Sequence, residues 1–243
     1  MERGLFAAAS GMLADQIRQD VIANNLANAT TAGFKGDVAV GEAFPDMLVN
    51  QLQSGASVGK LGLGSRITET ATDASQGSIV RTGNTYDLAI AGPGWFSVQG
   101  PSGKAYTQNG AFTVDAKGQL VTADALPVLD SNGRPVNVGG DNAVVTPDGN
   151  VTVGGRQVAK LAITALDPKR LHKLGDNLYT GTVDKTTATG RVEQGYLENS
   201  NVNSVKEMVD LISTMRSFEA GQKAVSAIDD SLGKAVNDVA RIT

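Results

Sequence analysis

The stretch DVIANNLANATTAGFK (residues 20–35) ends a segment whose apolar residues recur at three- and four-residue spacing. Such spacing, with no proline from Arg3 to Thr31, is typical of an amphipathic helix with one buried face. Gly33 suits the left-handed position that ends many helices, and Phe34 after it could contact the last turn as in a Schellman motif. The sequence therefore predicts a long N-terminal helix that ends near Gly33.

Three asparagines, Asn24, Asn25 and Asn28, stand on adjacent turns of this predicted helix, although asparagine is an indifferent helix former. Asn24 and Asn28 share one helix face, with Asn25 beside them. We interpret them as partly buried amides that find hydrogen-bond partners in only one alignment of two helices, which fixes register at some cost in stability. The alternative is that all three are solvated polar residues.

A second helical segment begins in SNVNSVKEMVDLI (residues 200–212), where Ser204 and Glu207 stand three residues apart as a capping box. Beyond this start, apolar residues keep three- and four-residue spacing almost to the end of the sequence, with no proline. This seam comprises Val205, Met208, Ile212, Met215, Val225, Ile228, Leu232, Ala235 and Val239. A seam of that length needs a partner helix, which the N-terminal helix or another copy of the chain would supply.

The residues between the two helical segments form short alternating stretches, such as WFSV at 95–98, separated by turn dipeptides. Asn109-Gly110, Asn132-Gly133 and Asp148-Gly149 are dipeptides that supply the positive φ angles of tight hairpin turns. The zone from about Ile79 to Arg191 is therefore predicted to be an antiparallel β domain.

We expect an α+β fold in which the N- and C-terminal helices pair as a coiled coil and an antiparallel β domain is inserted between them. The glycine- and serine-rich stretch SGASVGKLGLGS (54–65) is typical of an extended connection. The predicted parts are an N-terminal assembly helix at 1–35, an extended connector at 36–78, a β-rich middle domain at 79–198 and a C-terminal assembly helix at 199–243. Each amphipathic seam is too long and narrow to be buried against a small β domain alone, so the layout indicates an assembly protein.

The chain has 243 residues, a net charge of -4 and no cysteine. Charges of both signs are spread along the sequence, so no basic stripe is available for nucleic acid and no polybasic segment for a membrane surface. No apolar run approaches the roughly 20 residues that cross a bilayer, so no transmembrane segment is expected. GLFAAASGMLA (4–14) could pass for the core of a signal peptide, but the same helical phase continues to Leu26, so we expect no cleaved signal.

The sequence contains no strong motif for catalysis or metal binding. His172 is the only histidine, and one imidazole without cysteine cannot build the usual zinc site of three or four ligands. The pairs Gly62/Gly64 and Gly92/Gly94 lack the third glycine and the following lysine of nucleotide-binding loops. Some pair of carboxylates could stand at glycosidase spacing, but their scatter over turns and helix surfaces indicates solvation. We therefore predict a protein that is not an enzyme and has no catalytic residues, no cofactor and no metal.

Several motifs resemble the flagellar basal-body rod and hook family. NNLANATTAGFK (24–35) closely resembles the N-terminal signature of that family, and GYLENSNVNSVKEMVDLISTMRSFEAGQKAV (195–225) resembles its C-terminal signature. DLAIAGPGWFSV (87–98) is similar to the family's β-domain segments. The resemblance covers nearly the whole chain and implies a structural axial subunit of the bacterial flagellar basal-body rod.

The resemblance also implies polymerisation through the terminal helices into a helical shaft that transmits torque, outside the cytoplasmic membrane. The implied partners are copies of the chain itself, other rod and hook axial proteins, and the flagellar type III export apparatus. FPDML (44–48) looks more like the proximal rod type than the distal type. By the same analogy, the subunit interface comprises Leu5, Met12, Asn24, Asn25, Leu26, Asn28, Met208, Ile212, Met215, Val225, Ile228 and Leu232.

Other interpretations stay open at this point. Within the same family, the chain could be a distal rod or rod–hook junction subunit. In a different class, it could be a secreted glycan-binding module, which would leave both terminal helices without a role. An enzyme acting on peptidoglycan would need an added catalytic domain, for which the sequence has no room.

Overall fold

The computed structural model describes residues 2–43, 47–50, 57–61, 64–101, 103–139, 142–175, 177–184 and 189–240. Phe44 to Asp46, the first three residues of the FPDML motif, lie outside the described residues. The chain divides into two compact units. The helical unit comprises residues 1–26, 37–71 and 204–243, and the β unit comprises residues 27–36 and 72–203.

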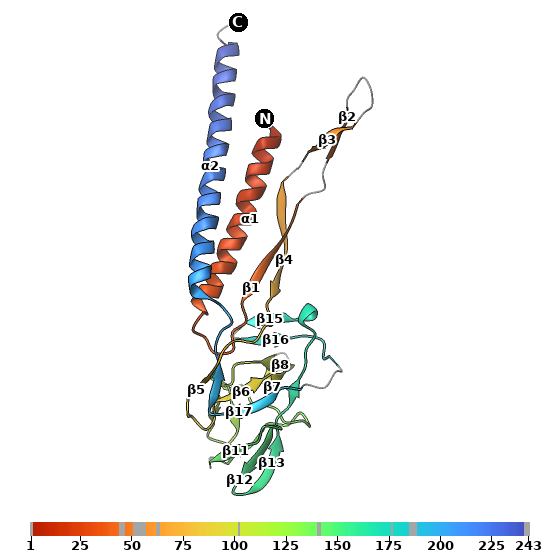
Figure 1. Cartoon of the computed structure of the whole chain (residues 1–243), viewed down its shortest axis with the longest axis vertical. Helices are drawn as coiled ribbons and strands as arrows, with labels where there is room; N and C mark the ends of the chain where they lie inside the picture. The colour runs from red at the N-terminus through yellow and green to blue at the C-terminus, as the bar shows by residue number, and fades with distance from the viewer. Residues whose placement is uncertain are drawn as a thin grey trace. The chain divides into compact units, whose positions relative to one another are not determined.

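Two long helices run side by side in the helical unit (Figure 1). Helix α1 spans Glu2–Ala27 and helix α2 spans Ser204–Ala240. α2 begins where the sequence predicts, and Glu207 in its first turn interacts favourably with the helix dipole. The helices are antiparallel, since Gly4 of α1 lies near Ile228 of α2 and Met12 lies near Gly221. The expectation of a helix at each end of the chain is confirmed.

Helix α1 ends at Ala27, earlier than the sequence predicts. The backbone carbonyl of Asn28 accepts a hydrogen bond from the Thr31 amide at 3.1 Å, and the Asn28 side-chain oxygen accepts one from the Thr31 hydroxyl at 3.2 Å. Such local bonds of asparagine and threonine compete with helix formation. Gly33 has the predicted positive φ, 66°, but its amide donates to the Glu198 carbonyl oxygen at 2.7 Å. The predicted Schellman ending is therefore wrong, and Gly33 instead serves a loop of the β unit.

In their described part, residues 36–78, predicted as an extended connector, contain four strands, which lie in the helical unit except for Thr72 at the end of the last strand. Strand β1 (Asp37–Ala43) pairs with β4 (Ser65–Thr72). Strand β2 (Met47–Asn50) pairs antiparallel with β3 (Ser57–Leu61). β1 begins with half-buried and exposed residues in alternation, as expected of a ribbon with one face covered.

The β unit consists of short strands whose pairings, among the residues that the structure describes, are all antiparallel. The strands are β5 (Ile79–Arg81), β6 (Leu88–Ala91), β7 (Trp95–Gly100), β8 (Gly103–Thr107), β9 (Thr113–Val114), β10 (Leu120–Val121), β11 (Ala143–Val145), β12 (Asn150–Val153), β13 (Arg156–Lys160), β14 (Ile163–Thr164), β15 (His172–Gly175), β16 (Leu178–Thr180), β17 (Arg191–Gln194) and β18 (Tyr196–Glu198). A short 3₁₀ helix, η1, spans Pro168–Arg170. The main sheet has the strand order β14-β7-β8-β16-β15, while β17 pairs with β6 and β18 with β5. The predicted antiparallel, β-rich middle of the chain is confirmed.

Two hydrophobic clusters hold the β unit together. The larger contains aliphatic side chains around Phe96 and Phe112, whose rings meet edge to face with centroids 5.2 Å apart. The smaller contains Trp95 and Tyr179, whose ring centroids lie 4.8 Å apart. Every buried residue of both clusters lies between Leu88 and Val192, so the β unit has its own core.

The predicted turn glycines have two different roles. Gly133 and Gly149 have positive φ angles of 76° and 79°, as the turn dipeptides predict. Gly110 has no positive φ, so the prediction for Asn109-Gly110 is wrong. A side chain at Gly110 would collide with the backbone carbonyl of Leu88, whose amide donates to the Gly110 carbonyl at 3.0 Å. Close approach of two backbones, rather than turn geometry, therefore requires glycine there.

Candidate assembly surfaces

One face of α2 packs on α1 within the helical unit. We call this the inner face; its half-buried residues are Leu211, Thr214, Phe218, Gly221, Val225 and Ile228. Their three- and four-residue spacing is that of a helix–helix seam. A Cβ atom placed on Gly221 would lie 2.7 Å from Cγ of Met12, and one on Gly4 would lie 3.6 Å from Cδ1 of Ile228. The absence of a side chain at Gly221 therefore allows Met12 to pack closely against α2.

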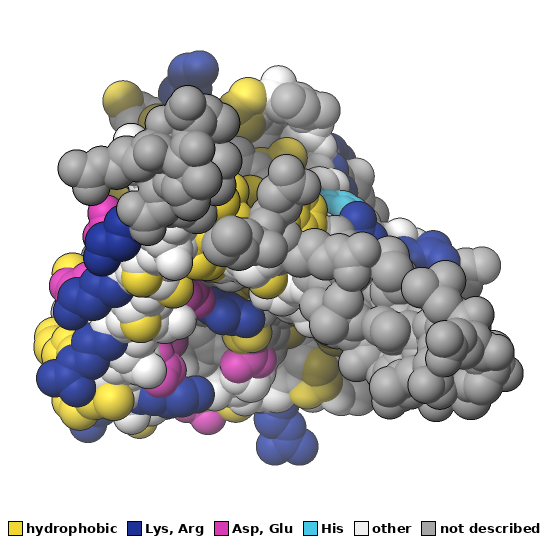
Figure 2. Space-filling model, turned by 90° about the horizontal axis from the view of Figure 1, so that it is seen from above, with side chains coloured by type: hydrophobic (Ala, Val, Ile, Leu, Met, Phe, Trp, Pro, Cys, Tyr) yellow, Lys and Arg dark blue, Asp and Glu magenta, His cyan; other side chains and the backbone are white. Residues whose placement is uncertain are grey.

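A second apolar face of α2 remains exposed. We call this the outer face; it consists of Val205, Met208, Ile212 and Met215. These side chains are between 49% and 70% exposed, although they too follow one another at three- and four-residue spacing. Figure 2 shows hydrophobic side chains at the surface of the molecule among charged ones of both signs. Single exposed apolar residues are ordinary, but an ordered series on one helix face marks a surface that another molecule covers.

A third apolar surface lies between α1 and β4. We call it the α1–β4 groove; its volume is about 330 Å³, and Phe6, Leu13, Ala14 and Ile17 of α1 line it together with Arg66 and Ile67 of β4. Phe6 and Leu13 are 59% and 61% exposed. The groove lies entirely within the helical unit, and in this chain no described segment fills it.

The asparagines of the opening stretch differ in their surroundings. Asn25 is buried, and its side chain makes two hydrogen bonds with the backbone of Asp37, each 2.8 Å long: Nδ2 donates to the carbonyl oxygen, and Oδ1 accepts from the amide. Asn24 is exposed, and Asn28 is half-buried in the turn after α1. Asn25 therefore joins the last turn of α1 to the first residue of β1 in the same chain.

The other residues predicted for the subunit interface fall into two groups. Met12, Val225 and Ile228 contribute to the contact between α1 and α2 of one chain. Leu26 is half-buried, whereas Leu5 and Leu232 are exposed, as Met208, Ile212 and Met215 are. The predicted set therefore combines contacts within the chain with side chains that remain open to another molecule.

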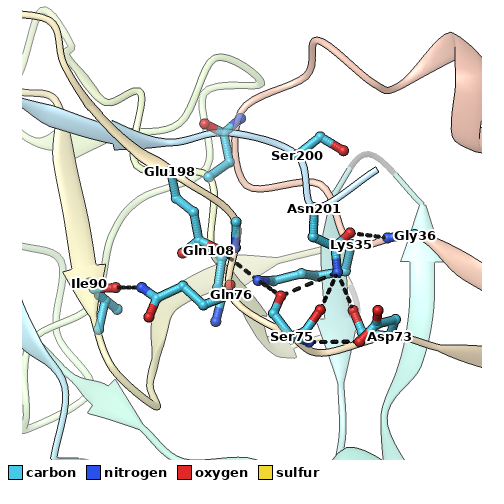
Figure 3. Close-up of polar contacts among 12 residues, drawn as sticks. Lys35, Gly36, Asp73, Ser75, Gln76, Ile90, Gln108, Glu198, Ser200 and Asn201 are labelled. Atoms are coloured by element: carbon cyan, nitrogen blue, oxygen red, sulfur yellow. Dashed lines mark hydrogen bonds and ion pairs between the residues drawn. The ribbon is translucent and has the colours of Figure 1, made fainter. Parts of the chain in front are cut away.

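A buried ion pair joins the two motifs that carried the family resemblance. Nζ of Lys35 lies 2.6 Å from Oε1 of Glu198, and their side chains are 0% and 2% exposed (Figure 3). The Lys35 ammonium also donates to the Ser75 carbonyl at 2.7 Å, and the same Glu198 oxygen accepts from the Gly77 amide at 2.8 Å. We call this pair with its partners the clasp. Because both charges are hydrogen-bonded, their burial is compensated.

Asn201 and Lys173 extend the clasp. The Asn201 side-chain oxygen accepts from the Gly36 amide at 2.8 Å, and its nitrogen donates to the Asp73 carbonyl at 2.9 Å (Figure 3). Lys173 donates to the Lys35 carbonyl at 2.7 Å, and its ammonium lies 4.1 Å from the centre of the Phe34 ring. Sequence reasoning missed the clasp, because a lysine and a glutamate so far apart in the chain give no local signal of pairing.

No part of the described structure suggests metal or acid–base chemistry. Among the residues that the structure describes, no three His, Cys, Asp or Glu side chains are grouped closely enough to bind a metal ion. His172 is exposed on β15, opposite Thr180 of β16. None of the helices, in their described residues, is both long and apolar enough to cross a membrane.

Comparisons with known proteins agree with the family resemblance of the sequence motifs. Residues 5–35 match the family described as "Flagella basal body rod protein". Residues 89–153 match "Flagellar hook protein FlgE/F/G D1 domain", and residues 193–238 match "Flagellar basal body rod FlgEFG protein C-terminal". The first and third matches include Lys35 and Glu198 respectively, so the clasp joins two separately matched segments.

Individual relatives align over nearly their full length. Flagellar basal-body rod protein FlgG of Buchnera aphidicola subsp. Schizaphis graminum is 36% identical over 257 residues, which cover 95% of this chain and 97% of the relative. FlgG of Bacillus subtilis is 33% identical over 267 residues, covering 98% and 99%. Flagellar basal-body rod protein FlgF of Caulobacter vibrioides is 34% identical over 251 residues, covering 100% of both chains.

The fold and these matches define a structural protein of the bacterial flagellum, and not an enzyme. More particularly, the chain belongs to the flagellar basal-body rod protein family. It is a structural subunit of the flagellar rod. Membership of this family indicates that the chain assembles with other rod and hook proteins.

Proposed function

We propose that the chain polymerises through its terminal helices into a helical shaft that transmits torque. The observation that carries this proposal is the outer face of α2, an ordered series of large apolar side chains that the chain itself leaves exposed. Burying such side chains at an interface gives about 1.5–3 kcal/mol each when burial is complete. Membership of the rod family supports copies of the chain and other rod and hook proteins as the partners.

We propose that α1 and α2 of one copy pair as a coiled coil and that the other residues predicted for the subunit interface join neighbouring copies. Met12, Val225 and Ile228 would then stabilise the pair, and Leu5, Asn24, Leu26, Asn28, Met208, Ile212, Met215 and Leu232 would reach other subunits. The paired amide of Asn25 would hold the ribbon that begins at Asp37 against the end of α1. Contacts between two different surfaces of successive copies generate an open helix whenever the rotation between them does not close.

The proposed position is the proximal rod, outside the cytoplasmic membrane, reached through the flagellar type III export apparatus without a cleaved signal peptide. The alignment with FlgF over the full length of both chains is compatible with this position. FlgG proteins align almost as completely, so a distal rod or rod–hook junction subunit is the alternative within the family. Cross-linking in isolated basal bodies, followed by identification of the neighbouring proteins, distinguishes the positions.

The assembly proposal is tested by placing a charge on the exposed apolar positions of α2. We expect Ile212→Asp or Leu232→Asp to abolish swimming and rod incorporation, because a carboxylate cannot be buried among apolar side chains without a partner. Ala220→Asp, at an exposed position of the same helix, is the control for the change in helix propensity. Fluorescence of Trp95 should show that the β unit remains folded in all three variants.

Normal swimming with wild-type incorporation of the Ile212→Asp chain would contradict the proposal. Peptide mass spectrometry of detergent-extracted hook–basal bodies gives a direct second test. We expect the chain in a fixed ratio to the other rod proteins. Its absence from preparations that contain those proteins would favour a secreted glycan-binding module built on the same fold.

A further inference from the structure

We infer that the outer face of α2 in one copy binds in the α1–β4 groove of a second copy of the chain. The inference rests on the proposed function, since it names the two surfaces through which successive copies would meet. Both surfaces are apolar and exposed, and both belong to the helical unit.

The two surfaces point away from the contact between α1 and α2. Ile212 and Met215 directly follow Leu211 and Thr214 of the inner face, and Leu13 directly follows Met12. One residue turns an α-helix by about 100°, so the exposed side chains are rotated out of the contact within the chain. A second copy can therefore reach both surfaces without separating the helices.

The dimensions of the two surfaces match. The outer face extends from Val205 to Met215 and the groove from Phe6 to Ile17, which at 1.5 Å per residue are lengths of about 15 and about 16 Å. The face presents branched and flexible apolar side chains, and the walls of the groove are formed by small and apolar ones. Methionine adapts to irregular apolar surfaces, which suits Met208 and Met215 to this contact.

Charge complements the apolar fit. Glu219 follows Met215 at four-residue spacing and is exposed, so it continues the line of the outer face with a carboxylate. Arg66 lines the groove, where it makes an exposed ion pair with Glu42 at 3.8 Å. A copy whose outer face lies in the groove can bring Glu219 toward the Arg66 guanidinium and add to this charge network.

The two surfaces stand at different heights along the helix pair, and this offset favours a chain of copies. Gly221 lies opposite Met12, close to the middle of the groove. The outer face is centred near residue 210, so it is displaced along α2 by about 11 residues, or about 17 Å. Where successive copies bind in the same direction, each copy is therefore shifted along the axis relative to the previous one, and the contact repeats without closing.

Disulfide cross-linking tests the inference directly, because the chain has no cysteine of its own. One copy carrying Leu13→Cys and a second, tagged copy carrying Ile212→Cys are co-expressed in the flagellated source bacterium, and its basal bodies are isolated and oxidised. We expect at least tenfold more disulfide-linked dimer than from the control pair Leu13→Cys and Asp229→Cys. Asp229 lies 17 residues further along α2, about 25 Å away.

Each result has a defined meaning. Dimer at the level of the control pair, in basal bodies that contain both chains, overturns the inference and leaves the proposed function intact. Absence of both chains from basal bodies that contain the other rod proteins overturns the proposed function, and the inference with it.

Charge complementation provides a second test. The single variants Leu13→Glu and Ile212→Lys should each reduce incorporation into basal bodies at least tenfold. The double variant L13E/I212K should recover most of the loss, because every contact between copies then brings the two opposite charges together. A double variant that incorporates no better than either single variant contradicts the pairing of these two surfaces.

Discussion

At the scale of single residues, the clasp buries two opposite charges, and each charge needs the other for compensation. Lys35 and Glu198 are 163 positions apart and are both withdrawn from water. A buried ion pair adds little net stability compared with an apolar pair, but removal of one partner leaves a charge without compensation. We therefore expect the clasp to act mainly on specificity, because only the native alignment of the segment before β1 with the end of β18 brings both charges together.

A double-mutant cycle measures that selectivity. We expect Lys35→Met and Glu198→Leu each to lower the free energy of unfolding of the β unit by about 3–5 kcal/mol, because each leaves a buried charge. The double variant should lose less than the sum, with about 1–3 kcal/mol remaining for the Gly77 amide left without its acceptor. Urea unfolding followed through Trp95, the only tryptophan, reports the β unit. Additive losses would show that the two charges are not coupled.

Asp130 makes the stability of the β unit depend on pH. Its carboxylate accepts hydrogen bonds from the backbone amides of Arg134 and Asn132, both at 2.8 Å. The bond from the Arg134 amide is the main cause that holds the pKa of Asp130 below its usual range, against the opposing effect of burial. A carboxyl group whose pKa is lower in the folded state contributes fully above its unfolded pKa and loses that contribution as pH falls through the folded value.

We therefore expect Asp130→Asn to flatten the acid limb of the stability profile. Between about pH 5 and about pH 2, the wild-type β unit should lose more free energy of unfolding than the variant. The reason is that an aspartate at position 130 takes up a proton in this range, whereas an asparagine there does not. Asp124→Asn, at an exposed position in another turn of the β unit, is the matched control for the loss of one carboxyl group. Equal slopes for wild type and Asp130→Asn would show that Asp130 does not contribute to the loss of stability in acid.

At the scale of elements, α2 is a helix with two apolar faces and two different roles. Its inner face packs on α1, and the side chains of its outer face are exposed. Two glycines in the same helix separate the effect of packing from that of helix propensity. Gly221 faces Met12, whereas a Cβ placed on Gly233 would meet no atom within 4 Å.

Substitutions at these two glycines should have opposite effects. Gly221→Leu is expected to destabilise the helical unit by about 1–3 kcal/mol, because the new side chain overpacks the contact with Met12. Gly233→Ala should stabilise it by about 0.5–1 kcal/mol through helix propensity alone. Urea unfolding followed by far-ultraviolet circular dichroism measures both. Addition of Met12→Ala to Gly221→Leu should recover part of the loss, and no recovery would place the strain elsewhere.

At the scale of the whole molecule, the β unit does not depend on the helices for its core. All buried residues of its two hydrophobic clusters lie between Leu88 and Val192, and the clasp also belongs to this unit. The exposed apolar surfaces considered for assembly belong instead to the helical unit. We therefore expect the β unit to fold without α2, while the proposed contacts between copies involve the helical unit.

Truncation after Asn203 tests this separation. We expect the shortened chain to keep the Trp95 fluorescence and to keep the free energy of unfolding of the β unit within about 1 kcal/mol, because Glu198 and Asn201 of the clasp remain. It should be absent from basal bodies, since α2 is missing. Loss of the β-unit transition would show that the helices support the β core, contrary to its independent clusters.

The parts of the fold that could be predicted from the sequence are those with local signals. The spacing of apolar residues along α2 and the pair Ser204 and Glu207 gave its start, and alternation with turn dipeptides gave the antiparallel middle. Glycine content was less reliable. It predicted a positive φ at Gly110, where close contact between two backbones is the reason for glycine.

The kinds of residue at the assembly surfaces could be predicted from the sequence, but the contacts that each residue makes could not. The outer-face residues stood in the apolar seam, yet periodicity alone could not separate them from the inner face, since both follow helical spacing. Asn25 was expected between helices, but its amide bonds the backbone of Asp37, a partner that no helix pattern reveals. Lys35 and Glu198 were visible only as letters of two motifs, because their pairing depends on tertiary structure.

The distance in sequence between the two halves of the clasp also sets an order of folding. Hairpins such as β7–β8 close short loops, whereas Lys35 must find Glu198 across most of the chain, at a greater entropic cost and a later time. The same delay applies to α1, whose partner α2 follows all the strands of the β unit in the chain. A chain that ends before Glu198 can form neither the Lys35–Glu198 ion pair nor the contact between α1 and α2. An incomplete chain therefore lacks both of these long-range contacts.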